Sequence, residues 1–193
     1  MKSFPQTIIF PGVLGLLMFS GASMSSAEST QDSERIRELL SEAKGHALEA
    51  EKVASTLEAY TRSRVSWKSH GHQLEAMKVH VNELGKVAGE MNGVKAEGSP
   101  WQQGAIQQVT PLLQEMASNL TQTIEHLNAN QSQVHMQVFR EYARTNYELA
   151  KRTADLIRDM VDYDEARSMA DSLEQKMELA QTQDTGKTTA TQD

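Results

Sequence analysis

The chain of 193 residues contains no cysteine. This absence excludes disulfide bonds, thiolate metal sites, cysteine nucleophiles and the covalent attachment of c-type haem. The stability of the folded chain must therefore come from side-chain packing. Long helices that pack against one another provide stability of that kind.

Concentrated basic charge is also missing. The formal net charge is −7 at pH 7, and the 19 lysines and arginines are interspersed with acidic residues. Nucleic-acid binding needs a cationic face for the phosphate backbone, so we expect no nucleic-acid partner. Gly-rich phosphate loops, nucleophile elbows and metalloprotease motifs are absent from the sequence as well. We therefore predict that the protein is not an enzyme and has no catalytic residues.

Residues 1–27 have the pattern of a secretory signal peptide. Lys2 supplies positive charge, residues 8–19 form a short apolar segment, and Ser25-Ser26-Ala27 resembles a cleavage site. The apolar segment is shorter than the roughly 20 residues that span a bilayer, so we expect no membrane span after cleavage. An uncleaved anchor is the alternative. We predict that the protein is periplasmic or secreted.

Apolar residues recur downstream at alternating steps of three and four, which places them on one stripe of a helix. The three clearest stripes are Trp67, His70, Leu74, Met77, Val81, Leu84, Ala88 and Met91; Ile106, Val109, Leu113, Met116, Leu120, Thr123 and Leu127; and Phe139, Tyr142, Asn146, Leu149, Thr153, Leu156, Met160 and Tyr163. Each helix must bury its stripe against another helix. The pattern predicts an all-α, antiparallel up-down-up-down four-helix bundle.

Local signals divide the predicted bundle domain, residues 28–181, into helices at about 32–62, 66–92, 99–127 and 134–180. Ser99, Pro100 and Gln102 form a strong start signal for the third helix. Pro111 lies within that helix, where we expect a kink or a broken turn. The spacing of Gly85 and Gly89 favours one close helix contact.

The fourth helix is predicted to be much longer than its partners, because residues 134–180 contain neither proline nor glycine. In an antiparallel bundle, its C-terminal end would lie beside the start of the first helix. We therefore predict a coiled-coil-like, two-helix extension, in which Ala166, Ala170, Leu173 and Met177 pair with Ile36, Leu39, Leu40 and Ala43. Residues 182–193, rich in Thr, Gln and Asp, are predicted to form a disordered tail.

Histidines are the first candidates for a metal site. Di-iron bundles use Glu-x-x-His, and none of the six histidines follows a glutamate at that spacing. In an antiparallel bundle, His70, His126 and His135 fall at one end, and three histidines could bind zinc or copper. Only His70 lies on an apolar stripe. We therefore predict no metal and no cofactor, and keep these three residues as the metal candidates.

The same end collects Tyr60, Trp67, Phe139 and Tyr142. We favour an aromatic plug that closes the bundle, with a ligand pocket as the alternative. Non-covalent haem would need an inward His or Met on each of two facing helices, but methionine on a helical stripe is more often flexible core filler. The polar residues Asn146, Thr153, Arg167 and Thr123 interrupt the stripes. We expect them to fix helix register, with the lining of a small-molecule cavity as the alternative.

Two stretches resemble exported bacterial proteins with no assigned activity. They run from Ser66-Trp67-Lys68-Ser69-His70 to Gly85, and from Ser99-Pro100-Trp101-Gln102-Gln103 to His126-Leu127-Asn128, within roughly residues 60–165. The resemblance implies a bacterial, exported helical protein and no site residues. The layout also resembles periplasmic four-helix bundles such as b-type and c′-type cytochromes. Only architecture carries over, because the haem-attaching cysteines of the latter are missing.

We predict a non-enzymatic, exported helical-bundle protein that acts through protein–protein contact as a scaffold, adaptor or helper. Its partner is expected to be a protein, and self-association into a homo-oligomer is left open. The alternative is a small-ligand, metal-binding or haem-binding four-helix bundle of the bacterial envelope.

Overall fold

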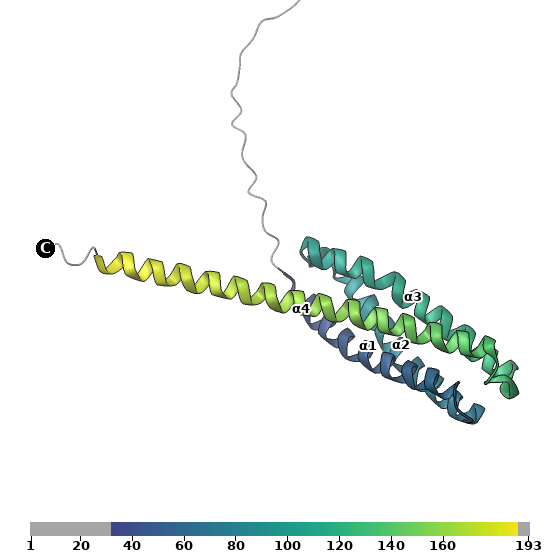
Figure 1. Ribbon diagram of the computed structural model, residues 1–193. Helices are drawn as coiled ribbons and strands as arrows, with labels where there is room; N and C mark the ends of the chain where they lie inside the picture. Colours follow the sequence, from purple (N-terminus) through teal and green to yellow (C-terminus); the bar gives the residue numbers. More distant parts are fainter. Residues whose placement is uncertain (1–31, 189–193) are drawn as a thin grey trace, which may run out of the picture.

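The computed structural model describes residues 32–188, with side chains described up to residue 180. These residues form α1 (Glu34–Tyr60), α2 (Trp67–Gly93), α3 (Pro100–Ala129) and α4 (Gln137–Thr188), with 3₁₀ turns η1 (Lys95–Glu97) and η2 (Gln131–Gln133). The described residues contain no strand. The predicted all-α four-helix bundle is confirmed (Figure 1). The predicted signal peptide, residues 1–27, lies outside the described residues.

Each helix packs on two neighbours, α1 on α2 and α4, and α3 on the same two helices. The core between them is filled by one apolar stripe from each helix. Its largest fully buried side chains are Ile36, Leu39, Leu40 and Leu57 from α1; Leu74, Met77, Leu84 and Met91 from α2; Ile106 and Met116 from α3; and Phe139 and Ile157 from α4. Burial of each such side chain stabilises the bundle by about 1.5–3 kcal/mol.

Polar contacts across the core link α3 to α4. Asn146 Nδ2 donates to Thr123 Oγ1 at 2.7 Å, and both side chains are fully buried. Asn146 Nδ2 also reaches the carbonyl of Tyr142 at 3.1 Å. A buried hydrogen bond between two helices is satisfied in only one alignment, which is consistent with the predicted role of these residues in helix register.

Two local features differ from expectation. α3 continues as one helix through Pro111, so there is no broken turn at this residue. Pro111 lies on the exposed side of the helix, so the carbonyl of Gln107, which loses its partner there, is on the exposed side as well. Gly85 and Gly89 are also exposed, and an added Cβ at either position would meet no atom within 4 Å. Neither glycine therefore makes the close helix contact that their spacing suggested.

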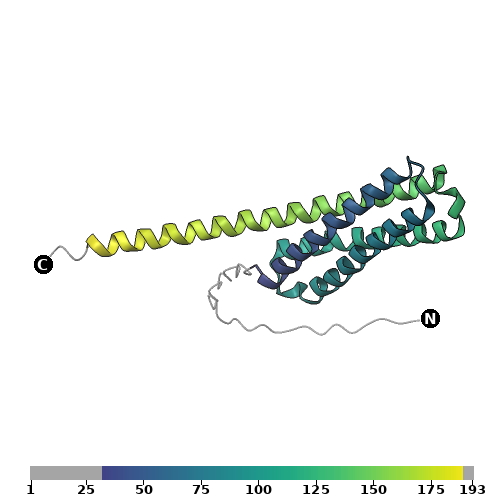
Figure 2. The ribbon, with the colours of Figure 1, turned by 90° about the horizontal axis from the view of Figure 1, so that it is seen from below.

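The fourth helix is long, as predicted, but it projects alone (Figures 1 and 2). Leu173 and Met177 are 54% and 64% exposed, while their predicted partners Ile36 and Ala43 are fully buried inside the bundle. Ala166 and Ala170 are exposed as well. The predicted two-helix extension is therefore wrong.

The α1–α4 register explains this error. Arg37, in the first turn of α1, binds Asp164 of α4, with 2.7 Å between Nε and Oδ2. The first turn of α1 is thus level with Asp164, and beyond that point Asp32, which precedes α1, binds Arg167 of α4. We call residues 165–188 the α4 projection. The helix also continues to Thr188, so residues 182–188 are helical and the prediction of a disordered tail is wrong for them. Residues 189–193 lie outside the described residues.

Close packing at the start of α3 generates a prediction. A Cβ added to Gly98 would lie 2.5 Å from Ile36 Cδ1, which is fully buried. Gly98→Ala should therefore lower the free energy of unfolding by about 1–3 kcal/mol in urea denaturation, because the core has to shift to fit the methyl group. Gly85→Ala is the matched control, and it should raise stability by about 0.5–1 kcal/mol, since this helical site is open. Equal effects at the two positions would contradict the packing described.

Candidate functional site

The predicted metal candidates do gather at one end of the bundle. His70 of α2 packs on His135 of the α3–α4 turn and on Phe139 of α4, with ring centroids 6.0 and 5.4 Å apart. His126 of α3 stacks on the same Phe139 at 6.3 Å. His70 and His126 therefore both pack on Phe139, while His135 contacts His70. Tyr60 meets the ring of His70 edge-on, and Tyr142 lies tilted against His126, so both tyrosines join Phe139 in an aromatic cluster. Trp67, which was also predicted to belong to the plug, is 36% exposed.

The ring nitrogens do not converge on a common point. His70 Nδ1 lies 2.9 Å from the carbonyl oxygen of Ser66, while His70 Nε2 and His126 Nε2 are buried without a hydrogen-bond partner among the described residues. His135 is exposed. Among the side chains of residues 32–180, no group of three or more His, Asp or Glu is arranged to hold a metal ion.

Burial controls the charge of His70, which has no exposed surface. Desolvation lowers the pKa of His70, a shift opposed by the carbonyl of Ser66, and the nearby charge of His135 lowers it further. The carbonyl of Tyr60, although not in good hydrogen-bond geometry with the ring, also acts to raise this pKa. The net effect is a lowered pKa, which favours the neutral form of the buried imidazole.

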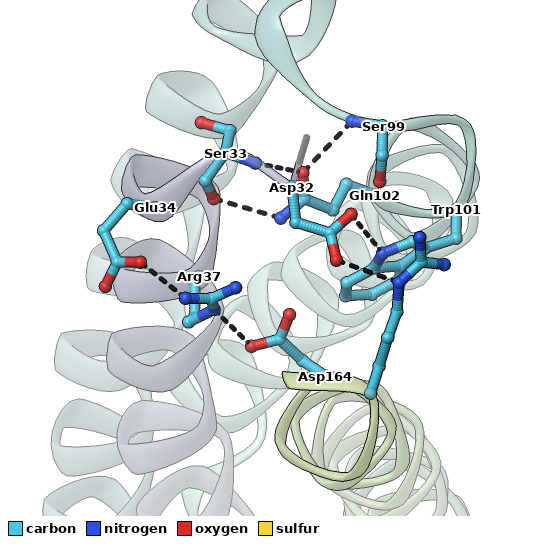
Figure 3. A network of polar contacts seen from close by, with 9 residues as sticks. Asp32, Ser33, Glu34, Arg37, Ser99, Trp101, Gln102 and Asp164 are labelled. Carbon is cyan, nitrogen blue, oxygen red and sulfur yellow. Dashed lines mark hydrogen bonds and ion pairs between the residues drawn. The ribbon is translucent and has the colours of Figure 1, made fainter. Parts of the chain in front are cut away.

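A polar network closes the opposite end of the bundle, where α4 leaves it (Figure 3). Its centre is Gln102 of α3, which is fully buried. Gln102 Oε1 accepts from the backbone N–H of Ser33 at 2.8 Å and of Ser99 at 3.2 Å. Its Nε2 donates to the carbonyl of Ser33 at 3.0 Å. One amide therefore satisfies backbone groups at the starts of both α1 and α3.

Asp32 connects this network to α4 (Figure 3). Its two carboxylate oxygens bind Trp101 Nε1 at 2.8 Å and Arg167 Nε at 3.1 Å. Trp101 packs against Tyr163 of α4, with ring centroids 5.1 Å apart. The segment that precedes α1, the first turn of α3 and the exit point of α4 are thereby held together.

Arg37 adds a second connection between α1 and α4. It pairs with Glu34 at 2.5 Å and with Asp164, which is only 3% exposed. Desolvation raises the pKa of Asp164, while the adjacent Arg37 acts to lower it. A carboxylate held this far from water requires its cationic partner, so the pair fixes how α1 and α4 are aligned.

Part of this network was predicted from the sequence. The start signal at Ser99 and Gln102 predicted the contact within α3, but not the bonds from Gln102 to Ser33. The roles of Asp32 and Trp101 were missed, because contacts between residues so far apart in sequence depend on the bundle register. The aromatic and amide side chains in the first turn of α3, Trp101, Gln102 and Gln103, were the available signal.

Beyond the network, the α4 projection has two different faces. The face that continues the bundle core is polar. An open concave surface lies along it, lined by Asp32, Arg37, Arg167, Ser168, Asp171 and Gln175. At about 100° per residue, Ala166, Ala170, Leu173 and Met177 lie on roughly the opposite side. Leu173 and Met177 are therefore exposed on this second face, because no other described helix packs against the α4 projection.

No family model, curated protein or solved structure matches this chain. Within residues 32–188, no helix combines the length and apolar character needed to cross a membrane.

The buried histidine generates a pH prediction. The folded state lowers the pKa of His70, so the unfolded chain binds a proton more readily, and this contribution to stability is present above the unfolded pKa of about 6.5. It is lost as pH falls through the lower folded pKa. Urea midpoints measured between pH 7.5 and 5 should therefore fall more steeply for the natural chain than for His70→Gln. His72→Gln, at an exposed site on the same helix, should retain the steep dependence. Identical profiles for the natural chain and His70→Gln would contradict a buried neutral ring.

The amide at the centre of the network generates another prediction. Gln102→Ala removes three hydrogen bonds and leaves backbone groups of Ser33 and Ser99 without partners. The free energy of unfolding should fall by about 1–3 kcal/mol. Gln108→Ala, at an exposed site on the same helix, should change it by at most about 0.5 kcal/mol. A similar small effect at Gln102 would show that the network contributes little.

Proposed function

We propose that the chain is an exported, non-enzymatic bacterial protein that acts through protein–protein contact, as a scaffold or adaptor, and that the α4 projection is its contact surface. The observation that carries the proposal is the exposed apolar face of this projection. Met169, Leu173 and Met177 are 68%, 54% and 64% exposed, although they are neighbours on one helix. Contiguous exposed apolar surface of this kind marks interaction sites in proteins.

The chemistry of this face suits recognition of another helix. Alanines alternate with larger side chains, so a second helix can approach closely. Methionine is flexible and polarizable, and adapts to the shape of a partner. A helix that lays one apolar face against a partner is a recurring mode of protein recognition.

The bundle has a distinct role in this proposal. It holds the first part of α4 on two sides, and the Asp32 and Arg37 contacts fix the point where the projection leaves. The projection is therefore presented in a defined direction. A helix that is already ordered loses less entropy when it binds than a free peptide does. Export, inferred from residues 1–27, would place this surface in the bacterial envelope or outside the cell.

A pull-down from the native envelope fraction tests the proposal. Deletion of residues 166–181 should abolish partner capture, while far-UV circular dichroism and thermal unfolding show an intact bundle. A finer variant, Leu173→Glu with Met177→Glu, should weaken capture at least tenfold, because two charges would be buried against the partner.

The matched control places two charges on the other face of the same helix, as Ser168→Glu with Gln175→Glu. This control should capture partners as the natural chain does. Unchanged capture after the deletion would overturn the proposed function, and equal loss in both charged variants would assign capture to the helix as a whole.

A second candidate function, binding of a metal or small ligand, rests on the histidine end. The observation that favours it is the pair of buried atoms His70 Nε2 and His126 Nε2, which lack hydrogen-bond partners among the described residues. Elemental analysis and an absorbance spectrum of protein purified from the periplasm test it. A bound metal that is lost in His70→Gln would support this function, and protein without metal or a Soret band would remove it.

A further inference from the structure

We propose that the occupant of the exposed face is the α4 projection of a second copy of this chain, paired antiparallel in a two-fold symmetric dimer. The inference rests on the proposed function, because it uses the same face and names its partner. A two-fold interface uses the same surface on both copies, so the dimer leaves no copy of this surface exposed for a third chain.

The face has the spacing of a helix-pairing seam. Its members alternate by three and four residues, as core positions of a two-stranded coiled coil do. They are Tyr163, Ala166, Ala170, Leu173, Met177 and Ala180, all of them exposed. The seam begins at the point along α4 beyond which α1 no longer packs on it. It runs along the side of the projection that faces away from the bundle core.

Side-chain size selects the antiparallel direction. When the two copies are centred between Asp171 and Ser172, Ala170 faces Leu173 of the second copy, Ala166 faces Met177, and Tyr163 faces Ala180. Every layer then joins a small side chain to a large one, so the two helices stay at an even distance. A parallel pairing would place alanine on alanine and methionine on methionine, which leaves alternating gaps and crowded layers.

Charge supports the same alignment. Arg167 and Glu174 flank the seam on one side, and the antiparallel register brings Arg167 of each copy beside Glu174 of the other. Arg167 binds Asp32 through Nε, and a guanidinium carries further N–H donors for a second carboxylate. On the other side, Met169 faces Lys176 of the second copy, whose alkyl chain can cover it.

The shape of the molecule also disfavours a parallel pair. In that arrangement, the outer surface of α4 within the bundle would face its own copy, and this surface carries the exposed Asp159 and Asp162. Two bundle bodies would be pressed together across charged surfaces that lose their water. The antiparallel arrangement places the bundles at opposite ends of the paired projections, where they do not meet.

The first test is the molar mass of the full chain, measured by sedimentation equilibrium over a range of concentrations. The natural chain should form a dimer. Leu173→Glu should weaken dimerisation at least tenfold, and Ser168→Glu on the opposite face should leave it unchanged. Glu174→Arg should also weaken it, because Arg167 of the second copy then meets another arginine.

The second test determines direction, and it is clean because the chain contains no cysteine. A mixture of Ala166→Cys and Met177→Cys chains should form an interchain disulfide on mild oxidation. Either variant alone should not do so efficiently, because each cysteine then faces a residue of the other type. Efficient crosslinking of Ala166→Cys with itself would overturn the antiparallel register.

These results separate the inference from the proposed function. A chain that is monomeric at all concentrations overturns the self-pairing, while loss of capture on deletion of residues 166–181 would still support a different protein partner. A dimer that needs Leu173, together with capture that does not need residues 166–181, would support the self-pairing and overturn the role of this surface in capture.

Discussion

The structure depends on how far the buried apolar seam extends along α4. Burial of one stripe from each helix is the main stabilising interaction of the bundle, since apolar area is its chief source of stability. Along α4, this seam runs from Phe139 to Val161, and the buried carboxylate of Asp164 follows it. The first turn of α1 is level with Asp164, and beyond the contact between Asp32 and Arg167 no described helix packs along α4. The projection follows from this difference in length.

The end of the seam is held by polar contacts instead of apolar ones. Gln102 satisfies backbone groups before α1 and α3, and the Asp32 and Arg37 contacts tie both helices to α4. Helix ends always leave backbone groups without partners inside the helix, and here one network satisfies several of them together. The same network determines where α4 leaves the bundle. The same residues therefore stabilise this end of the bundle and determine the direction in which the exposed face of α4 projects.

The stripes predicted four helices and most of the core, because periodic apolar residues report directly on a buried face. They also predicted Asn146 and Thr123 as polar interruptions, which proved to bond to each other.

The predicted pairing of the α4 projection with α1 was wrong for a geometric reason. A strict seven-residue repeat drifts by about 20° per heptad around a straight helix. Leu149 is buried, Tyr163 is 51% exposed and Met177 is 64% exposed, so one continuous repeat passes from the core to the outer surface. The repeat can be read from the sequence, but the point along α4 beyond which α1 no longer covers it cannot. The contacts of Asp32 and Trp101 were missed for the same reason, because they depend on how α1 and α4 are aligned.

Amide hydrogen exchange of the intact chain at two protein concentrations tests the central claim most directly. That claim is that the face of residues 166–180 is a contact surface which a second copy covers. We expect residues 139–164 to exchange slowly at both concentrations, since the bundle protects them, and residues 166–180 to exchange more slowly at the higher concentration. Exchange in residues 166–180 that is fast and independent of concentration would contradict the account.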